Sequence, residues 1–286
     1  LLPGSGAYDS WIQYQTYDIT EFLKEENEAE VCLGNGWYKG DYGLSSKKDV
    51  YGDRFVLLAE LHMEYEDGTR EVLVTDTDWK ARKSPVLYSD IYNDTCEVSM
   101  GYDKLKARLN PPIRIHERLK PIEVIHTPAV ETVLDMGQNM VGWVEFTVTA
   151  PAGTRIRLQH GEILQDDCFY VENLRTAKQE FIYICHEGVN HVRAHFTFYG
   201  FRYVLVEGWP YEVKAEDFMG CVIHSDMEET GRIETSNPLV NQLFENTRWG
   251  QKGNFLDTPT DCPQRDERMG WTGDAQIFCG TASYNM

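Results

Sequence analysis

The sequence has no apolar run approaching the roughly 18 residues that a membrane-spanning helix requires. Basic residues are also scarce, because 27 lysines and arginines stand against 46 aspartates and glutamates, which gives a formal net charge of −19. A protein of that charge repels phosphate backbones and anionic lipid surfaces. We therefore expect no membrane span, no membrane partner and no nucleic-acid partner.

Closely spaced cysteines and compact Cys/His clusters are missing too, because the seven cysteines are scattered and no CxxC pair occurs. His160, His186, His191 and His195 show no spacing that forces them together, so we interpret them as structural. We expect no metal and no cofactor. An odd number of cysteines outside any disulfide framework favours a cytoplasmic protein, with export of the full-length protein left open.

Apolar and aromatic residues are plentiful, at 42% and 12% of the chain, which predicts packed globular units. With 286 residues the chain is long enough for two or three domains. Both ends look cut, since Leu1 replaces a starting methionine, no signal peptide follows it, and the last residues lie within an amphipathic stretch. We expect an internal fragment of a longer protein.

Two runs of short alternating strands account for most of the chain. In the first run, residues 55–65 and 71–75 are expected to form a hairpin across a glycine-containing turn, and prolines then mark a linker. The second run, from about 122 to 223, has Gly/Pro turns at the spacing of a sandwich. The predicted fold class is mainly β, with two antiparallel, jelly-roll-like β-sandwich domains at 1–110 and 111–225.

The apolar period changes from 2 to 3.6 in the last part of the chain. We expect a helix over residues 236–252, capped by Ser236 or Asn237 and with a proline in its first turn. A second helix is expected to start at Gly273. One helical hairpin cannot bury its own apolar face, so we interpret residues 226–286 as the truncated start of a helical domain.

The loop between the two expected helices mixes carboxylates with arginines and a tryptophan. Carboxyl groups in different surroundings of one cleft hold different pKa values, as glycosidic bond cleavage requires. Trp271 offers an aromatic face to a sugar ring, and Arg265 offers a fork of donors to its hydroxyls. On residue types alone, a solvated acidic loop held by local ion pairs is an equal alternative. The residues concerned are Asp257, Asp261, Arg265, Asp266, Glu267, Arg268, Trp271 and Asp274.

Residues 261–274, DCPQRDERMGWTGD, closely resemble the catalytic signature of the bacterial α-L-rhamnosidases, family 78 of the glycoside hydrolases. The resemblance continues upstream in WYKG at 37–40, SDIY at 89–92 and DMGQNMVGW at 135–143, and so covers most of the chain. It implies a carbohydrate-binding-like first sandwich and a concanavalin-like second one. It also implies an (α/α)6 catalytic barrel, of which residues 226–286 form the first helical hairpin.

The resemblance further implies an inverting glycosidase that releases terminal α-L-rhamnose from glycosides or polysaccharides. Glu267 takes the role of the general acid, and Asp261, Arg265, Trp271 and Asp274 take sugar-binding roles. The general base lies further along the barrel in this family, so we expect the fragment alone to be inactive. The expected partner is a carbohydrate substrate, a rhamnoside, and homo-oligomers of the full-length enzyme are left open.

A general acid must carry a proton near neutral pH, which requires Glu267 to have a raised pKa. We expect like charge from Asp261, Asp266 and Asp274 to raise it. Asp266 and Arg268 are expected to form a local ion pair and to stay away from the sugar.

Two other functions stay open. A carbohydrate-binding β-sandwich module would use Trp37, Tyr38 and Trp143, although Trp37 is more typical of a core tryptophan that closes a sandwich end. Residues 89–94 carry oxygen-bearing side chains suited to hydroxyl groups or calcium, yet an ordinary Asx-rich turn is favoured there. The other function is a six-hairpin glycosidase that acts on a different sugar.

Overall fold

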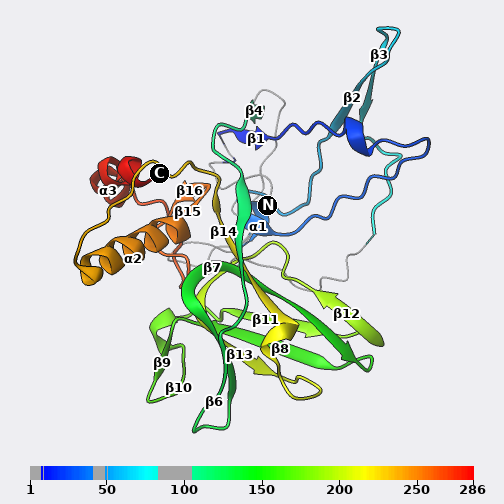
Figure 1. Cartoon of the computed structure of the whole chain (residues 1–286). Coiled ribbons are helices and arrows are strands. Elements are labelled where there is room, and N and C mark those ends of the chain that lie inside the picture. Colours follow the sequence, from blue (N-terminus) through cyan, green and yellow to red (C-terminus); the bar gives the residue numbers. More distant parts are fainter. Residues whose placement is uncertain (1–7, 9, 41–48, 50, 83–104) are drawn as a thin grey trace.

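The computed structural model describes residues 8, 10–40, 49, 51–82 and 105–286 (Figure 1). Within these residues no helix is both long and apolar enough to cross a membrane. The elements in chain order are β1 (Ile12–Tyr14), η1 (Thr20–Phe22), α1 (Gly36–Lys39), β2 (Glu60–Glu64), β3 (Arg70–Val74), β4 (Leu105–Ala107), β5 (Ile113–Leu119), β6 (Glu123–His126), β7 (Thr132–Ala150), β8 (Arg155–Gly161), β9 (Ile163–Gln165), β10 (Cys168–Tyr170), η3 (Glu172–Leu174), β11 (Glu180–Ile184), β12 (Gly188–Val192), β13 (Tyr199–Glu207), η4 (Ala215–Asp217), β14 (Phe218–Ser225), α2 (Pro238–Asn254), β15 (Phe255–Leu256), β16 (Thr258–Pro259) and α3 (Thr272–Asn285).

One curled sheet of eight strands dominates the fold. Its strands follow the path β11–β8–β13–β7–β14–β5, and β6 and β12 pair with β7 outside that path, all of them antiparallel. β7 is 19 residues long and changes partners along its length. Its first residues pair with β6 and β13, and its last residues pair with β14 and β12. The predicted second sandwich is thus one continuous sheet that folds over on itself around β7 (Figure 1).

Gly142 makes this change of partners geometrically feasible. It pairs with Tyr199 of β13 on one side and with Val222 of β14 on the other. Its φ is 154°, and a Cβ there would lie 1.7 Å from the carbonyl oxygen of Cys221. Because no side chain fits so close to a neighbouring backbone, only glycine lets the strands approach at this point.

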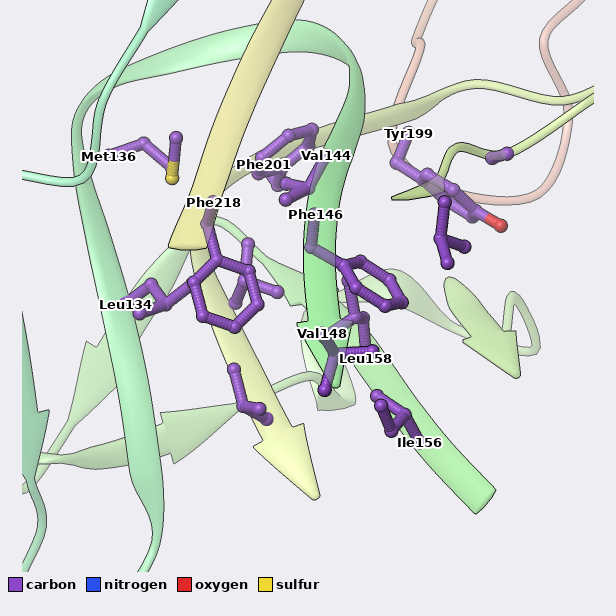
Figure 2. Close-up of a cluster of buried hydrophobic side chains, with 14 of the residues drawn as sticks. Leu134, Met136, Val144, Phe146, Val148, Ile156, Leu158, Tyr199, Phe201 and Phe218 are labelled. Carbon is purple, nitrogen blue, oxygen red and sulfur yellow. The ribbon is translucent and has the colours of Figure 1, made fainter. Parts of the chain in front are cut away.

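Alternate side chains of these strands fill the interior of the curled sheet. Phe146 of β7 lies in the middle of the cluster beside Phe218, with ring centroids 6.1 Å apart (Figure 2). Full burial of a side chain of this size stabilises a fold by about 1.5–3 kcal/mol. Other members are Leu134, Met136, Val144, Val148, Ile156, Leu158, Tyr199 and Phe201.

The described part of the N-terminal region contains two small ladders. β1 pairs in parallel with β4, and β2 pairs with β3 as the predicted hairpin, whose turn has Gly68 at a φ of 82°. The hairpin stands away from the curled sheet (Figure 1). Residues 89–94 and the side chain of Trp37 lie outside the described part. The mainly β fold class is confirmed, since among the described residues only the four-residue α1 adds α-helix before residue 238.

The α2 helix begins as the sequence predicts. The side chain of Asn237 caps it by accepting a hydrogen bond from the Leu239 N–H at 3.0 Å, and Pro238 occupies the first turn. α3 starts at Thr272, one residue before the predicted Gly273. The expected arrangement of helix, long loop and helix is therefore confirmed.

Each of these two helices packs on one side and leaves apolar side chains in water on the other. Trp249 of α2 packs against the core of the curled sheet. A buried hydrogen bond of 2.8 Å from Asn285 Nδ2 to Gln251 Oε1 joins α3 to α2. The most exposed aliphatic side chains of the two helices are those of Leu239, Leu243 and Ile277, at 78%, 66% and 86%.

A buried ion pair joins the linker before the curled sheet to the start of the loop between α2 and α3. Arg108 Nη2 lies 2.8 Å from Asp257 Oδ1, and the two side chains are only 9% and 2% exposed. The Arg108 guanidinium also donates to the carbonyl oxygens of Asn110 and Pro111, at 2.9 Å each. The N–H of Asp257 donates to Ser225 Oγ, at the end of β14. Linker, sheet and loop thus meet at one charge pair.

Removing one partner of this pair leaves a buried charge without its counter-ion. We expect Arg108→Ala to lower the free energy of unfolding by about 3–5 kcal/mol. Arg114→Ala is the matched control, because Arg114 pairs with Asp226 at 2.9 Å but is 65% exposed, and its loss should stay below about 1 kcal/mol. Urea denaturation measures both losses, and equal values would contradict the role of the buried pair.

Acid should weaken the curled sheet through His160. This fully buried ring stacks on Tyr199 at 3.9 Å and donates from Nδ1 to the carbonyl oxygen of Gln179 at 3.0 Å. Burial lowers the pKa of His160 from 6.5 to about 4. As the pH falls, His160 becomes protonated near pH 6.5 in the unfolded chain but only near pH 4 in the folded chain. The free energy of unfolding therefore decreases between these two pH values. We expect a loss of about 3 kcal/mol from this residue.

Urea denaturation at a series of pH values checks this expectation. His160→Gln keeps a donor for Gln179 but cannot be protonated, so its stability should fall less steeply between pH 6.5 and 4. His191→Gln, on the exposed side of β12, is the control and should follow the parent chain. Parallel curves for the parent and His160→Gln would refute the assignment.

Candidate active site

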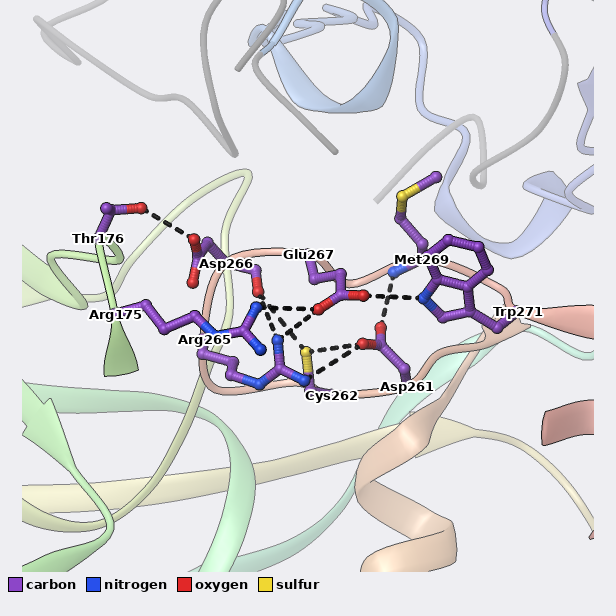
Figure 3. Close-up of polar contacts among 9 residues, drawn as sticks. All are labelled: Arg175, Thr176, Asp261, Cys262, Arg265, Asp266, Glu267, Met269 and Trp271. Atoms are coloured by element: carbon purple, nitrogen blue, oxygen red, sulfur yellow. Dashed lines mark hydrogen bonds and ion pairs between the residues drawn. The ribbon is translucent and has the colours of Figure 1, made fainter. Parts of the chain in front are cut away.

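The loop between α2 and α3 closes on itself through Asp261. The N–H of Asp261 donates to the carbonyl oxygen of Met269 at 3.0 Å, and Asp261 Oδ1 accepts from the Met269 N–H at 2.9 Å. Residues 262–268 are therefore held as a closed loop between these two residues (Figure 3). Asp261 is only 11% exposed. One of its oxygens thus shapes the loop, and the other is left for a second partner.

Glu267 lies at the centre of this loop and accepts hydrogen bonds from three side chains. Its Oε2 accepts from Arg265 Nη1 at 2.5 Å and from Arg175 Nη1 at 3.1 Å, and its Oε1 accepts from Trp271 Nε1 at 2.9 Å (Figure 3). The backbone has positive φ at Glu267 and Arg268, 123° and 52°. Such conformations are unfavourable for residues other than glycine and persist where surrounding contacts enforce them.

The electrostatics of Glu267 differ from the sequence-based expectation. The hydrogen bond from Arg265, followed by that from Trp271, lowers the pKa of the Glu267 carboxyl, so the expected rise is wrong for this arrangement. The carboxylates of Asp261 and Asp266 have partners of their own. Asp261 shares Arg265, at 3.6 Å between Oδ2 and Nη2, and Asp266 accepts from Thr176 at 2.9 Å. These contacts therefore favour the carboxylate form of Glu267.

The other residues of the signature are placed unequally. Trp271 is 42% exposed at the start of α3, while its indole N–H is bound to Glu267. The Arg265 fork is engaged by carboxylates of its own loop. Asp274 lies exposed in the first turn of α3, and among the described residues no hydrogen bond or ion pair joins it to Glu267. The structure thus brings together Asp261, Arg265, Glu267 and Trp271, but leaves Asp274 apart.

The expected ion pair between Asp266 and Arg268 does not form. Asp266 turns to Thr176, whereas the Arg268 guanidinium lies 4.5 Å from the centroid of the Phe198 ring and is 7% exposed. Consecutive positive φ angles at residues 267 and 268 turn the two side chains in different directions. Arg268 therefore fastens the loop to the curled sheet by a cation–π contact.

Three contacts to this loop come from a segment that the sequence did not point to, residues 175–179, which we call the docking strip. Arg175 and Thr176 bind Glu267 and Asp266, and Gln179 Nε2 donates to the carbonyl oxygen of Gln264. The strip follows η3 in the curled-sheet domain, 85–92 residues before its partners. No motif or spacing marks it, because its role arises only when two distant segments meet.

Asp261, Cys262 and Glu267 form a group whose potential metal-binding atoms lie within 4.8 Å of one another. Their chemistry does not favour a metal ion. Burial raises the pKa of the Cys262 thiol to about 11, so it stays protonated and donates to Asp261 Oδ2 at 3.4 Å. Arg265 already neutralises both carboxylates.

A pocket of about 610 Å³ lies on the other side of Asp261, between β7, β13 and α2. Its lining is rich in amides, which already bond to their neighbours. Gln242 donates to Asn246 at 2.7 Å, and Asn139 donates to Glu162 at 3.1 Å. The pocket thus borders the loop and is lined in part by side chains that hydrogen-bond one another.

Two of the three aromatic residues considered for a binding module, Trp143 and Tyr38, are described, and neither is an exposed platform. Trp143 is half-buried, packs against both hydrophobic clusters and directs its Nε1 toward Glu145 at 3.4 Å. Tyr38 is half-buried with its ring edge-on to Tyr8, 5.7 Å between centroids. Both therefore serve packing.

Three family models match the chain one after another. They are the α-L-rhamnosidase N-terminal domain over residues 1–104, the bacterial α-L-rhamnosidase concanavalin-like domain over 125–224, and the bacterial α-L-rhamnosidase six-hairpin glycosidase domain over 228–286. Among curated proteins, an α-L-rhamnosidase of Streptomyces avermitilis is 38% identical, over 100% of this chain and 30% of its own length. One of Alteromonas sp. (strain LOR) is 33% identical, over 99% of this chain and 34% of its own length.

Solved structures agree with these matches. The native α-L-rhamnosidase of Aspergillus terreus has a TM-score of 0.92 at 35% identity, over 99% of this chain and 36% of that chain. The Streptomyces avermitilis α-L-rhamnosidase complexed with L-rhamnose has a TM-score of 0.88 at 36% identity, over 100% of this chain and 30% of that chain. The chain spans about a third of the length of the curated relatives it matches. On the three consecutive domain matches and the likeness along its whole length, the chain belongs to the bacterial α-L-rhamnosidase family.

Proposed function

We propose that this chain is part of a longer, inverting α-L-rhamnosidase and that Glu267 is its general acid. The observation that carries the proposal is the convergence of Asp261, Arg265 and Trp271 on Glu267 in one closed loop. The relative from Streptomyces avermitilis was solved with L-rhamnose, which supports rhamnose as the sugar. We further propose a cytoplasmic, reducing location, which the free thiols of Cys185, Cys221 and Cys262 within the fold support.

In the proposed reaction, the bond between the anomeric carbon and the leaving oxygen breaks while a proton passes from Glu267 to that oxygen. A base on the opposite face of the sugar takes a proton from the attacking water, and inversion requires about 6.5–9.5 Å between the two carboxyl groups. Asp261 approaches Glu267 within 4.8 Å, which leaves too little room for that water. We therefore assign Asp261 to sugar binding and place the base outside these 286 residues.

Sugar binding provides the exchange of partners that Glu267 needs. Sugar hydroxyls are suited to the Arg265 guanidinium and to Asp261 Oδ2, which, among the described residues, is held only by the weak thiol donor of Cys262 and by Arg265. A sugar ring is suited to the partly exposed Trp271. When hydroxyls take the Arg265 donors, Glu267 loses its strongest hydrogen bond. Its affinity for a proton then rises, and the carboxyl becomes competent as an acid.

The first test concerns the chain alone. Because we place the base outside it, the purified 286-residue chain should hydrolyse an aryl α-L-rhamnoside no faster than buffer. Exposed Leu239, Leu243 and Ile277 fit an apolar helix face that the remaining barrel helices cover. The full-length protein is the positive control, and a panel of other aryl glycosides checks the sugar. Turnover by the short chain would overturn the assignment of the base.

The second test concerns Glu267 in the full-length protein. Glu267→Gln keeps the shape of the side chain but removes the transferable proton, so the rate should fall about 10²–10⁴-fold for poor leaving groups. An activated aryl group needs less protonation and should lose distinctly less. Asp261→Asn and Trp271→Ala should instead weaken both substrate types alike, because they act on the sugar. Equal losses for both leaving groups in Glu267→Gln would make Glu267 a binding residue.

A further inference from the structure

One of the three donors to Glu267 comes from another domain. Arg265 and Trp271 belong to the signature loop, whereas Arg175 lies in the docking strip, 92 residues earlier. Its guanidinium approaches Glu267 from the side opposite Trp271 (Figure 3). The Glu267 carboxylate is 12% exposed and the Arg175 side chain is 50% exposed, so the arginine reaches in from solvent.

The docking strip is fixed at both of its ends. Leu174, the last residue of η3, is fully buried, and Gln179 is 5% exposed. The carbonyl oxygen of Gln179 accepts from the backbone N–H of His160 at 2.9 Å and from its ring at 3.0 Å. Positive φ angles of 58° at Arg175 and 48° at Gln179 then turn the strip toward the loop. The position of Arg175 is therefore set by the curled sheet and not by the loop that it contacts.

The strip and the loop meet over consecutive residues. Thr176 donates to Asp266 at 2.9 Å, next to the Arg175 contact, and Gln179 reaches the backbone of Gln264. A Cβ on Gly200 of β13 would lie 2.7 Å from Gln264 Cβ, so the loop is seated closely against the sheet. The contact between Arg175 and Glu267 belongs to this interface between strip and loop, and it is the contact that involves the proposed general acid.

We propose that Arg175 is a positioning residue for the rhamnosidase reaction, holding the Glu267 carboxylate in one orientation from across the domain boundary. The proposal rests on the proposed role of Glu267. Because the fixed sheet sets the place of Arg175, its contact with Oε2 persists when a sugar draws Arg265 away. The carboxylate then keeps one defined partner while it exchanges the others.

The role has a consequence for the pH dependence of catalysis. Among the described residues, the titratable and charged groups that face Glu267 are Asp261, Cys262 and Arg265 from its loop and Arg175 from the strip. Arg175 favours the charged form of Glu267. Removal of the Arg175 guanidinium should raise the pKa of Glu267, so the carboxyl group stays protonated to higher pH. The alkaline limb of the pH–rate profile should then shift to higher pH.

Arg175→Gln and Arg175→Lys in the full-length protein test this proposal. We expect Arg175→Gln to move the alkaline limb of kcat/KM to higher pH and to lower kcat by less than about tenfold, as for other partly exposed ion pairs. Arg175→Lys keeps a positive charge at this position, so its pH–rate profile should lie close to that of the parent protein. Arg118→Gln is the matched control, because Arg118 is also 50% exposed and pairs with Glu145 at 2.6 Å, outside the group of contacts around Glu267, and should leave the limb in place.

Thr176→Val separates positioning from mere docking. It removes the neighbouring hydrogen bond to Asp266 but leaves the guanidinium, so the alkaline limb should not move. Equal shifts in Thr176→Val and Arg175→Gln would show that the strip only seats the loop, and would overturn the proposal.

The carboxyl titration of Glu267 decides the matter without turnover. In the 286-residue chain, its ¹³C carboxyl resonance, assigned by its loss in Glu267→Gln, should titrate at higher pH in Arg175→Gln than in the parent. An unchanged midpoint would overturn the role of Arg175. If the full-length protein fails to cleave rhamnosides, the proposed function falls, and this titration still decides whether Arg175 governs Glu267.

Discussion

Charge compensation is the constraint on which the arrangement of this molecule depends. The loop between α2 and α3 carries several carboxylates in a chain of net charge −19, and it can pack against the curled sheet only if arginines meet them. Arg108 does so at the start of the loop and Arg265 within it, while Arg175 adds a contact from the sheet side. The positions of these three arginine side chains therefore determine the conformation of the loop.

Charge compensation and the proposed catalytic role make opposing demands on the Glu267 carboxyl group. The contacts that fold the loop favour its ionised form, whereas the general acid that we propose it to be must hold a proton. An enzyme resolves such a conflict when its substrate replaces some of the stabilising partners. Under the proposed reaction, the loop without sugar is stabilised by arginines that pair with Asp261 and Glu267, and a bound sugar makes Glu267 reactive by displacing some of these partners.

Whether a feature of the fold or of the site could be predicted from the sequence depends on how far apart along the chain the residues that determine it lie. The cap of α2 was predicted because Asn237 and Pro238 act within a few residues of one another. The proximity of Asp261, Arg265, Glu267 and Trp271 could be anticipated for the same reason, because they lie close together in one short loop, whereas their roles stay predictions. The partners of Glu267 and Asp266 in the docking strip were not predicted, because no local pattern links residues 90 apart. The sign of the Glu267 pKa shift was wrong because neighbouring like charges are visible in a sequence, whereas their neutralisation is visible only in space.

The separation between the docking strip and its loop also bears on how the chain assembles. Folding of non-local contacts is slowed by the entropy of closing the intervening segment. The strands of the curled sheet lie between residues 113 and 225, so a chain made from its N-terminus completes them before the loop emerges. The docking strip is then already folded, and the side-chain donors of Arg175, Thr176 and Gln179 are hydrated until the loop binds them. The curled sheet thus serves as a template on which the loop between α2 and α3 folds.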